Sequence, residues 1–92
     1  MTLIVENNHF LDVTVFVRGS GADLRLGDVT GKNTETFPLN PQRIPMASGL
    51  RFRVDPIGSN RNYLSPRVYP DGATTVVLNV GSELEQSYIT VR

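Results

Sequence analysis

The feature of this sequence that most constrains its fold is a period-two alternation of apolar and polar residues. In an extended strand, successive side chains point to opposite faces of a sheet, whereas a helix repeats about every 3.6 residues. The alternation is clearest in residues 11–18, 50–55 and 75–80, where one set of alternate positions is apolar and the other is mostly polar. This pattern indicates antiparallel sheets with one face on a core and the other in water.

Turn-forming residues divide the chain into short segments. Glycine, proline, asparagine and aspartate mark turns at residues 19–22, 30–33 and 70–73. Between such signals the sequence predicts strands at residues 3–6, 11–18, 23–29, 35–39, 50–55, 63–69, 74–80 and 87–92. This spacing predicts an all-β fold, an antiparallel β-sandwich of about seven or eight short strands, immunoglobulin-like or prealbumin-like in type.

Three segments interrupt the strand pattern. Residues 40–48 contain Pro41 and Pro45 and cannot form a central strand, so we expect them to carry the chain from one sheet to the other. Residues 55–62 are rich in turn formers and predict a surface loop. Residues 81–86 have capping-box spacing without an amphipathic run behind it, which predicts one helical turn at most.

The composition is that of one small globular domain. The 92 residues are 39% hydrophobic and 20% charged, which predicts a single β-sandwich domain over residues 1–92. The formal net charge is zero, which argues against nucleic acid as a partner because non-specific binding needs excess positive charge. The chain has no cysteine, so a disulfide, a thiolate zinc site and a cysteine nucleophile are excluded.

No apolar stretch has the length of a transmembrane helix, so we expect no transmembrane segment. The first residues, Met1 to Glu6, lack the charged and apolar regions of a signal peptide. Either the protein is cytoplasmic, or a signal peptide was removed and the protein is periplasmic or extracellular.

The sequence offers no catalytic constellation. His9 is the single histidine, and Asp12, three residues on, would point to the opposite face of a strand. The carboxylates are scattered, and no phosphate loop or calcium loop is present. We therefore expect neither an enzyme nor a cofactor or metal site.

The outward faces of the strands carry the candidate interaction residues. Arg51 and Arg53 share a strand face, and Tyr63 and Tyr69 flank the same region, so this face could bind a glycan, a small anion or an acidic partner. The alternative is a solvated face on which arginine stems cover apolar neighbours. Phe16 is a further candidate, because it is aromatic on an otherwise polar face.

The last strand, residues 87–92, is a candidate edge. It is rich in residues that favour strands, and it carries Tyr88. An edge strand has unpaired backbone groups that can pair with another chain. This predicts a protein partner, or self-association through an edge strand.

The runs at residues 5–17, 25–29 and 55–58, with the Pro-Asp-Gly turn at 70–72, resemble small exported bacterial β-sandwich domains of unknown function, including predicted lipoproteins of Gemmatimonas-like bacteria. The rhythm is also similar to that of immunoglobulin-like and prealbumin-like sandwiches, without the disulfide and tryptophan of antibody domains. The resemblance implies export and a role in binding or assembly.

These observations favour a non-enzymatic interaction or structural module, an extracytoplasmic accessory domain or a subunit docked on a larger assembly. The alternative is a carbohydrate- or anion-binding module that uses the arginine face.

Overall fold

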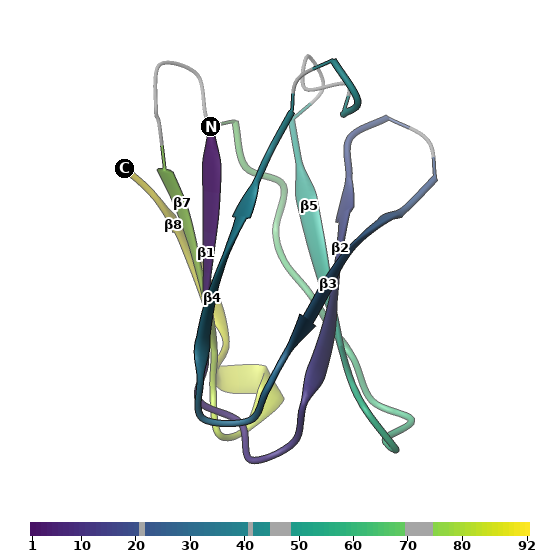
Figure 1. The fold of residues 1–92 in the computed structure, drawn as a ribbon. Coiled ribbons are helices and arrows are strands. Elements are labelled where there is room, and N and C mark those ends of the chain that lie inside the picture. Colours follow the sequence, from purple (N-terminus) through teal and green to yellow (C-terminus); the bar gives the residue numbers. More distant parts are fainter. Residues whose placement is uncertain (21, 41, 45–48, 70–74) are drawn as a thin grey trace.

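Two four-stranded sheets packed face to face form a β-sandwich in the computed structural model (Figure 1). The structure describes residues 1–20, 22–40, 42–44, 49–69 and 75–92. The described strands are β1 (Thr2–Asn7), β2 (Val13–Arg18), β3 (Leu24–Val29), β4 (Thr34–Pro38), β5 (Arg51–Pro56), β6 (Tyr63–Leu64), β7 (Thr75–Val80) and β8 (Tyr88–Val91). One short 3-10 helix, η1 (Leu84–Gln86), precedes β8. The all-β sandwich expected from the alternation is confirmed.

The strand order is β4-β1-β7-β8 in one sheet and β3-β2-β5-β6 in the other. The β1–β7 pair is parallel, and the other described pairs are antiparallel. In the immunoglobulin arrangement the first two strands, A and B, share a sheet. Here β1 and β2 lie in different sheets, so the strand order is not the immunoglobulin one.

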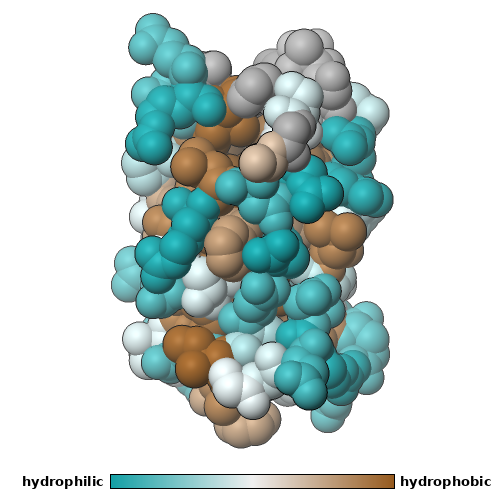
Figure 2. Space-filling view, turned by 90° about the vertical axis from the view of Figure 1, so that its right-hand side faces the viewer, coloured by the Kyte–Doolittle hydropathy of each residue, from teal (hydrophilic) through white to brown (hydrophobic). Residues whose placement is uncertain are grey.

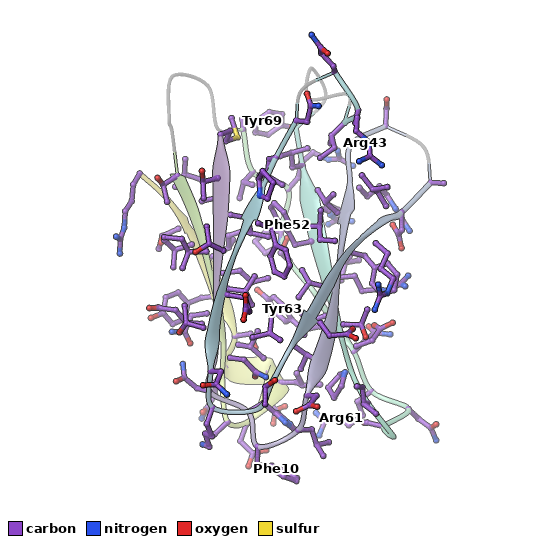
Figure 3. All side chains as sticks on the ribbon, in the orientation of Figure 1. Phe10, Arg43, Phe52, Arg61, Tyr63 and Tyr69 are labelled. Carbon is purple, nitrogen blue, oxygen red and sulfur yellow. The ribbon has the colours of Figure 1, made fainter. Side chains whose placement is uncertain are left out.

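The core lies between the sheets, where alternate residues of each strand point inward. Phe52 of β5 sits in the middle of this layer (Figure 3). The other fully buried large side chains come from both sheets and are Leu3, Val5, Val13, Val15, Val17, Val29, Leu39, Leu50, Val54, Val76 and Leu78. Burying one such side chain contributes roughly 1.5–3 kcal/mol. The period-two pattern therefore fixes which face of each strand is inside.

A buried asparagine joins the two turns at one end of the sandwich. The Nδ2 group of Asn7 donates to the carbonyl oxygens of Leu11 (3.0 Å), Val29 (3.2 Å) and Thr30 (3.3 Å). Its Oδ1 atom accepts from the backbone N–H of His9 at 3.0 Å. Asn7 is 1% exposed. Its amide therefore satisfies backbone groups that the strands leave unpaired where they end.

The β3–β4 turn packs closely on the β1–β2 connection at the same end. Lys32 adopts a φ of 65° and donates its backbone N–H to the carbonyl of His9 at 3.1 Å. A Cβ atom at Gly31 would lie 2.3 Å from the carbonyl oxygen of Phe10. Glycine is therefore needed here for the close approach of two backbones.

The expected strands all have counterparts, with one clear difference. We expected one strand over residues 63–69, but β6 ends at Leu64, and only an isolated bridge between Leu50 and Val68 follows. Ser65 causes the break, since its hydroxyl accepts from the N–H of Phe52 and donates to the carbonyl of Pro66. The Ser65 N–H still bonds to the Phe52 carbonyl at 2.8 Å, so the buried hydroxyl replaces one of the two backbone hydrogen bonds of this pair.

The expected connections can be compared where the structure describes them. The chain passes from β4 in one sheet to β5 in the other, as expected, and residues 41 and 45–48 of the predicted connection lie outside the described residues. Residues 57–62 are exposed, and residues 31–32 form a turn. The single helical turn expected within residues 81–86 is η1. The expected turn at 70–73 and residue 21 of the turn at 19–22 lie outside the described residues.

Candidate functional site

Three of the candidate interaction residues meet on the outer face of the β3-β2-β5-β6 sheet. The register of the antiparallel pair places Phe16 opposite Arg53, and Arg18 opposite Arg51. The guanidinium carbon of Arg53 lies 4.2 Å from the centre of the Phe16 ring. Hydrophilic side chains with separate hydrophobic areas between them cover this side of the molecule (Figure 2). The sheet thus presents an aromatic ring surrounded by charged groups.

Asp23 holds two of the arginines on this face. Its Oδ1 atom lies 2.7 Å from Nε of Arg18, and its Oδ2 atom lies 2.5 Å from Nη1 of Arg53. The Nε atom of Arg53 also lies 3.2 Å from Oδ1 of Asp55, although these two buried atoms are not aligned for a hydrogen bond. A carboxylate shared by two guanidinium groups orders both. Sequence reasoning missed Asp23, although its place just after the turn from Arg18 was a usable signal.

Arg51 differs from its neighbours because no partner for its guanidinium is found within the described residues. Its Nε atom is buried without a hydrogen bond, and the residue directly across the strand pair is Arg18, which has the same charge. Arg25, by contrast, is paired with Asp28 at 2.9 Å. Arg51 therefore carries the uncompensated positive charge of this face.

We expected Tyr63 to flank the arginine pair on the outer face, but the structure places it elsewhere. It pairs with Val54 of β5 and packs against the core. Figure 3 shows its side chain between the sheets. Burial raises the pKa of the Tyr63 phenol above its usual value of 10.0. Tyr63 faces inward because of its register with β5. Val54 faces inward, and its cross-strand partner lies on the same face of the sheet.

Tyr69 lies at the end of the sandwich that also carries Arg43 (Figure 3). It is 65% exposed, and its ring covers the backbone at Gly49, where a Cβ atom would be 2.8 Å from Cε1 of Tyr69. The structure thus places Tyr63 and Tyr69 apart from each other, and the surface expected from Arg51, Arg53 and both tyrosines is not assembled.

Tyr88 lies on the other sheet. It is on β8, opposite Asn79 of β7, and is 54% exposed on the outer face. Val77 of β7 alternates with the inward-facing Val76 and Leu78, and it is buried between its cross-strand neighbours Ile4 and Thr90. The strands on either side of β7 therefore cover an apolar side chain on the outer face of this sheet.

β8 is an edge strand, and its unpaired backbone groups can be assigned. Thr75 and Arg92 exchange both backbone hydrogen bonds, at 3.4 and 2.8 Å. Bonded and non-bonded pairs alternate along an antiparallel ladder, so Thr90 also bonds to β7. The N–H and C=O groups of Ile89 and Val91 then point away from β7, at the open side of the strand.

The other edge strands of the described structure have features that block pairing. β3 has a register irregularity opposite Val15 and Phe16, and it carries the charged Arg25 and Asp28. β4 contains Pro38, which lacks an N–H group, and β6 has only two residues. Bulges, charges, prolines and short length are the usual protections of sheet edges. The four residues of β8, Tyr-Ile-Thr-Val, have none of these.

His9 contacts its neighbours in the connection between β1 and β2. Its Nδ1 atom accepts the backbone N–H of Leu11 at 3.1 Å, and its ring stacks on Phe10 with centroids 4.9 Å apart. Asp12 instead accepts the N–H of Gly31 at 2.9 Å. His9 and Asp12 therefore do not form the pair that a triad would need. Within the described ranges, no cluster of three or more His, Cys, Asp or Glu side chains could hold a metal ion.

A shallow cleft opens between the edges of β3 and β4, with a volume of about 170 Å³. Its apolar lining is Leu24, Leu26, Phe37, Pro38 and Ile44, and its polar lining is Arg25, Asn40 and Arg43. A cleft of this size is smaller than the roughly 300–1,000 Å³ of typical ligand pockets.

Searches of protein-family models, curated proteins and solved structures give no match to this chain. Across the described residues, the structure contains no helix with the length and apolar character required to span a bilayer.

Proposed function

We propose that this chain is a non-enzymatic interaction module that docks by adding its β8 edge to a strand of a partner. The proposal rests on one observation, the difference between β8 and the other described edge strands, β3, β4 and β6. β8 alone among the described edge strands lacks a proline, a bulge, an internal charge or a very short length. Natural sandwiches protect edges that must not pair, so an unprotected edge favours a pairing role.

The chemistry of β8 suits strand addition. The outward N–H and C=O groups of Ile89 and Val91 supply backbone hydrogen bonds, which give affinity in this mode. Tyr88 is 54% exposed and Val91 is 40% exposed, so apolar surface accompanies these groups. Hydrophobic area and aromatic side chains next to unpaired backbone groups are what a docking strand needs.

The setting of this role is part of the proposal. The resemblance to exported bacterial sandwich domains favours an extracytoplasmic accessory domain, or a subunit docked on a larger assembly. Of the two sandwich types considered, the strand order leaves the prealbumin-like one as our proposal.

A proline scan of two edges tests the proposal. Val91→Pro removes an outward N–H without removing a bond to β7. Thr36→Pro on β4 is the matched control, because the bonds from Leu39 to Met1 and from Asn7 to Asn33 place the Thr36 N–H outward as well. The tagged protein is purified from its native cells, and its companions are quantified.

We expect the wild type and Thr36→Pro to retain the same partner at fixed stoichiometry, and Val91→Pro to lose it while remaining folded by circular dichroism. Equal recovery of the partner by Val91→Pro would overturn the assignment of β8 as the docking edge.

A second candidate function is anion binding at Arg51. The specific observation in its favour is the buried Nε atom of Arg51, which has no hydrogen-bond partner, beside the like-charged Arg18. An anion between the two would satisfy this donor and offset the repulsion. The positions of Tyr63 and Tyr69 favour a small anion over a carbohydrate, because neither tyrosine adjoins the arginines and the Phe16 ring is covered by Arg53.

A phosphate titration followed by NMR tests this site. Arg51→Gln should weaken phosphate binding by roughly tenfold or more, since a hydrogen bond to a charged group contributes about 1.5–3 kcal/mol. Arg25→Gln is the control, because Arg25 already has Asp28 as its partner. Equal binding by wild type and Arg51→Gln would remove Arg51 from the site.

A further inference from the structure

We infer that the partner of β8 is the β8 strand of a second copy of this chain, paired antiparallel about a two-fold axis at Thr90. The inference deepens the proposed function and rests on it. It follows from the hydrogen-bond pattern of the strand and from the match between its own side chains.

Backbone geometry restricts the possible registers. The groups available for pairing belong to Ile89 and Val91, because Thr90 and Arg92 already bond to β7. In an antiparallel pair, outward-pointing residues must face each other. When residues 88–92 of the two copies pair with one another, the register with Ile89 opposite Val91 uses both residues of both copies and gives four backbone hydrogen bonds.

This register also matches the side chains. On the inner side, Ile89 meets Val91 of the second copy, an apolar contact between two β-branched side chains. On the outer side, Thr90 meets Thr90, and Tyr88 faces Arg92 of the second copy. Cross-strand β-branched pairs and threonine pairs stabilise sheets. An arginine beside a tyrosine ring adds a cation–π attraction.

The self-complementarity favours a second copy over an unrelated strand. The two-fold axis passes between the Thr90 residues, so the Thr90–Thr90 contact occurs once and every other contact occurs twice, as in an isologous dimer. The Tyr88–Arg92 contact places the charged Arg92 side chain on an aromatic ring rather than against a like charge. The interface would join two four-stranded sheets into one continuous sheet of eight strands.

Cysteine cross-linking tests this register directly, since the chain has no cysteine of its own. In the inferred dimer the two Thr90 residues form a non-hydrogen-bonded pair, with Cα atoms about 4.5 Å apart. This separation lies in the range of about 4.4–6.8 Å that a disulfide requires. Thr90→Cys should therefore form a disulfide-linked dimer in a glutathione redox buffer. Thr36→Cys, on the exposed outer side of β4, is the matched control.

We expect Thr90→Cys to form the linked dimer at least about tenfold faster than Thr36→Cys at equal protein concentration. A second variant, Thr90→Lys, places like charges opposite each other at the axis and should leave the protein monomeric by sedimentation. Equal cross-linking rates for the two cysteine variants, or unchanged self-association of Thr90→Lys, would overturn the inference.

The two proposals fail in different ways. If Thr90→Cys does not cross-link but Val91→Pro still loses a partner of a different sequence, the second copy is wrong and the docking edge stands. If Val91→Pro retains every partner and cross-linking also fails, both proposals are wrong.

Discussion

The guanidinium of Arg53 lies over the ring of Phe16, 4.2 Å from its centre, directly across the β2–β5 pair. The same guanidinium is held by Asp23. The aromatic side chain that looked available to a partner is thus covered by a neighbour in its own sheet. Because Arg53 covers its ring, Phe16 has less surface free to contact a partner. We expect it to contribute instead to the stability of the fold.

A double-mutant cycle between Phe16 and Arg53 measures this contact. Phe16→Ala and Arg53→Ala should each destabilise the fold, and their coupling free energy should be about 0.5–1 kcal/mol, as found for partly exposed cation–π pairs. Urea denaturation of the four proteins gives the value. A coupling indistinguishable from zero would mean that the stacking contributes nothing.

Asn7 should be among the most sensitive polar positions of the chain. Asn7→Ala leaves the carbonyls of Leu11 and Val29 and the N–H of His9 without their partner, so we expect a loss of about 2–4 kcal/mol of unfolding free energy. Asn8→Ala is the control, because Asn8 Nδ2 donates to Oδ1 of Asn79 in a solvent-exposed hydrogen bond and its removal should cost less than about 0.5 kcal/mol. Similar losses for both variants would contradict the assigned role.

Alanine substitutions at Gly31 and Gly58 distinguish the cost of a steric clash from the cost of an unfavourable backbone conformation. Gly31→Ala should destabilise the protein by about 2 kcal/mol or more, because the new Cβ atom would lie 2.3 Å from the Phe10 carbonyl. At Gly58 nothing lies within 4 Å, so Gly58→Ala costs only the strain of a φ of +77°, about 1 kcal/mol. Thermal unfolding of both variants checks the order. A larger loss at Gly58 would contradict the packing of the two turns.

Tyr63 should make stability fall with rising pH in alkaline solution. Burial raises the pKa of its phenol above 10.0, so above that pH the unfolded chain releases a proton that the folded chain retains. The unfolding free energy therefore decreases from about pH 10 up to the raised pKa, and Tyr63 has no effect below this range. Tyr63→Phe should have a shallower decrease between pH 9 and 11 by urea denaturation, and an identical decrease would contradict the inward position.

Much of the fold could be predicted because one face of each central strand is buried. The alternation along residues 11–18 and 75–80 places Val15 and Leu78 inside without knowledge of their partners. The break after Leu64 could not be predicted, because it depends on a Ser65 hydroxyl that bonds to Phe52 of a different strand. Periodicity describes one strand at a time and contains no information about such tertiary contacts.

The candidate site was predicted only in part for the same reason. Arg51 and Arg53 are two residues apart on one strand, so their shared face follows from the sequence. The inward position of Tyr63 depends on its register with β5, and a two-residue strand carries no alternation from which to predict it. The role of Asp23 depends on the fold bringing Arg18 and Arg53 to one carboxylate.

Residue-level amide hydrogen exchange at low and high protein concentration tests the pairing of β8 most directly. We expect the amides of Ile89 and Val91 to exchange rapidly in dilute protein and to become protected as concentration rises. The amides of Tyr88 and Thr90, which bond to β7, should change little. Rapid exchange of Ile89 and Val91 at every concentration, with no other binding partner that protects them, would contradict the claim that β8 is a pairing edge.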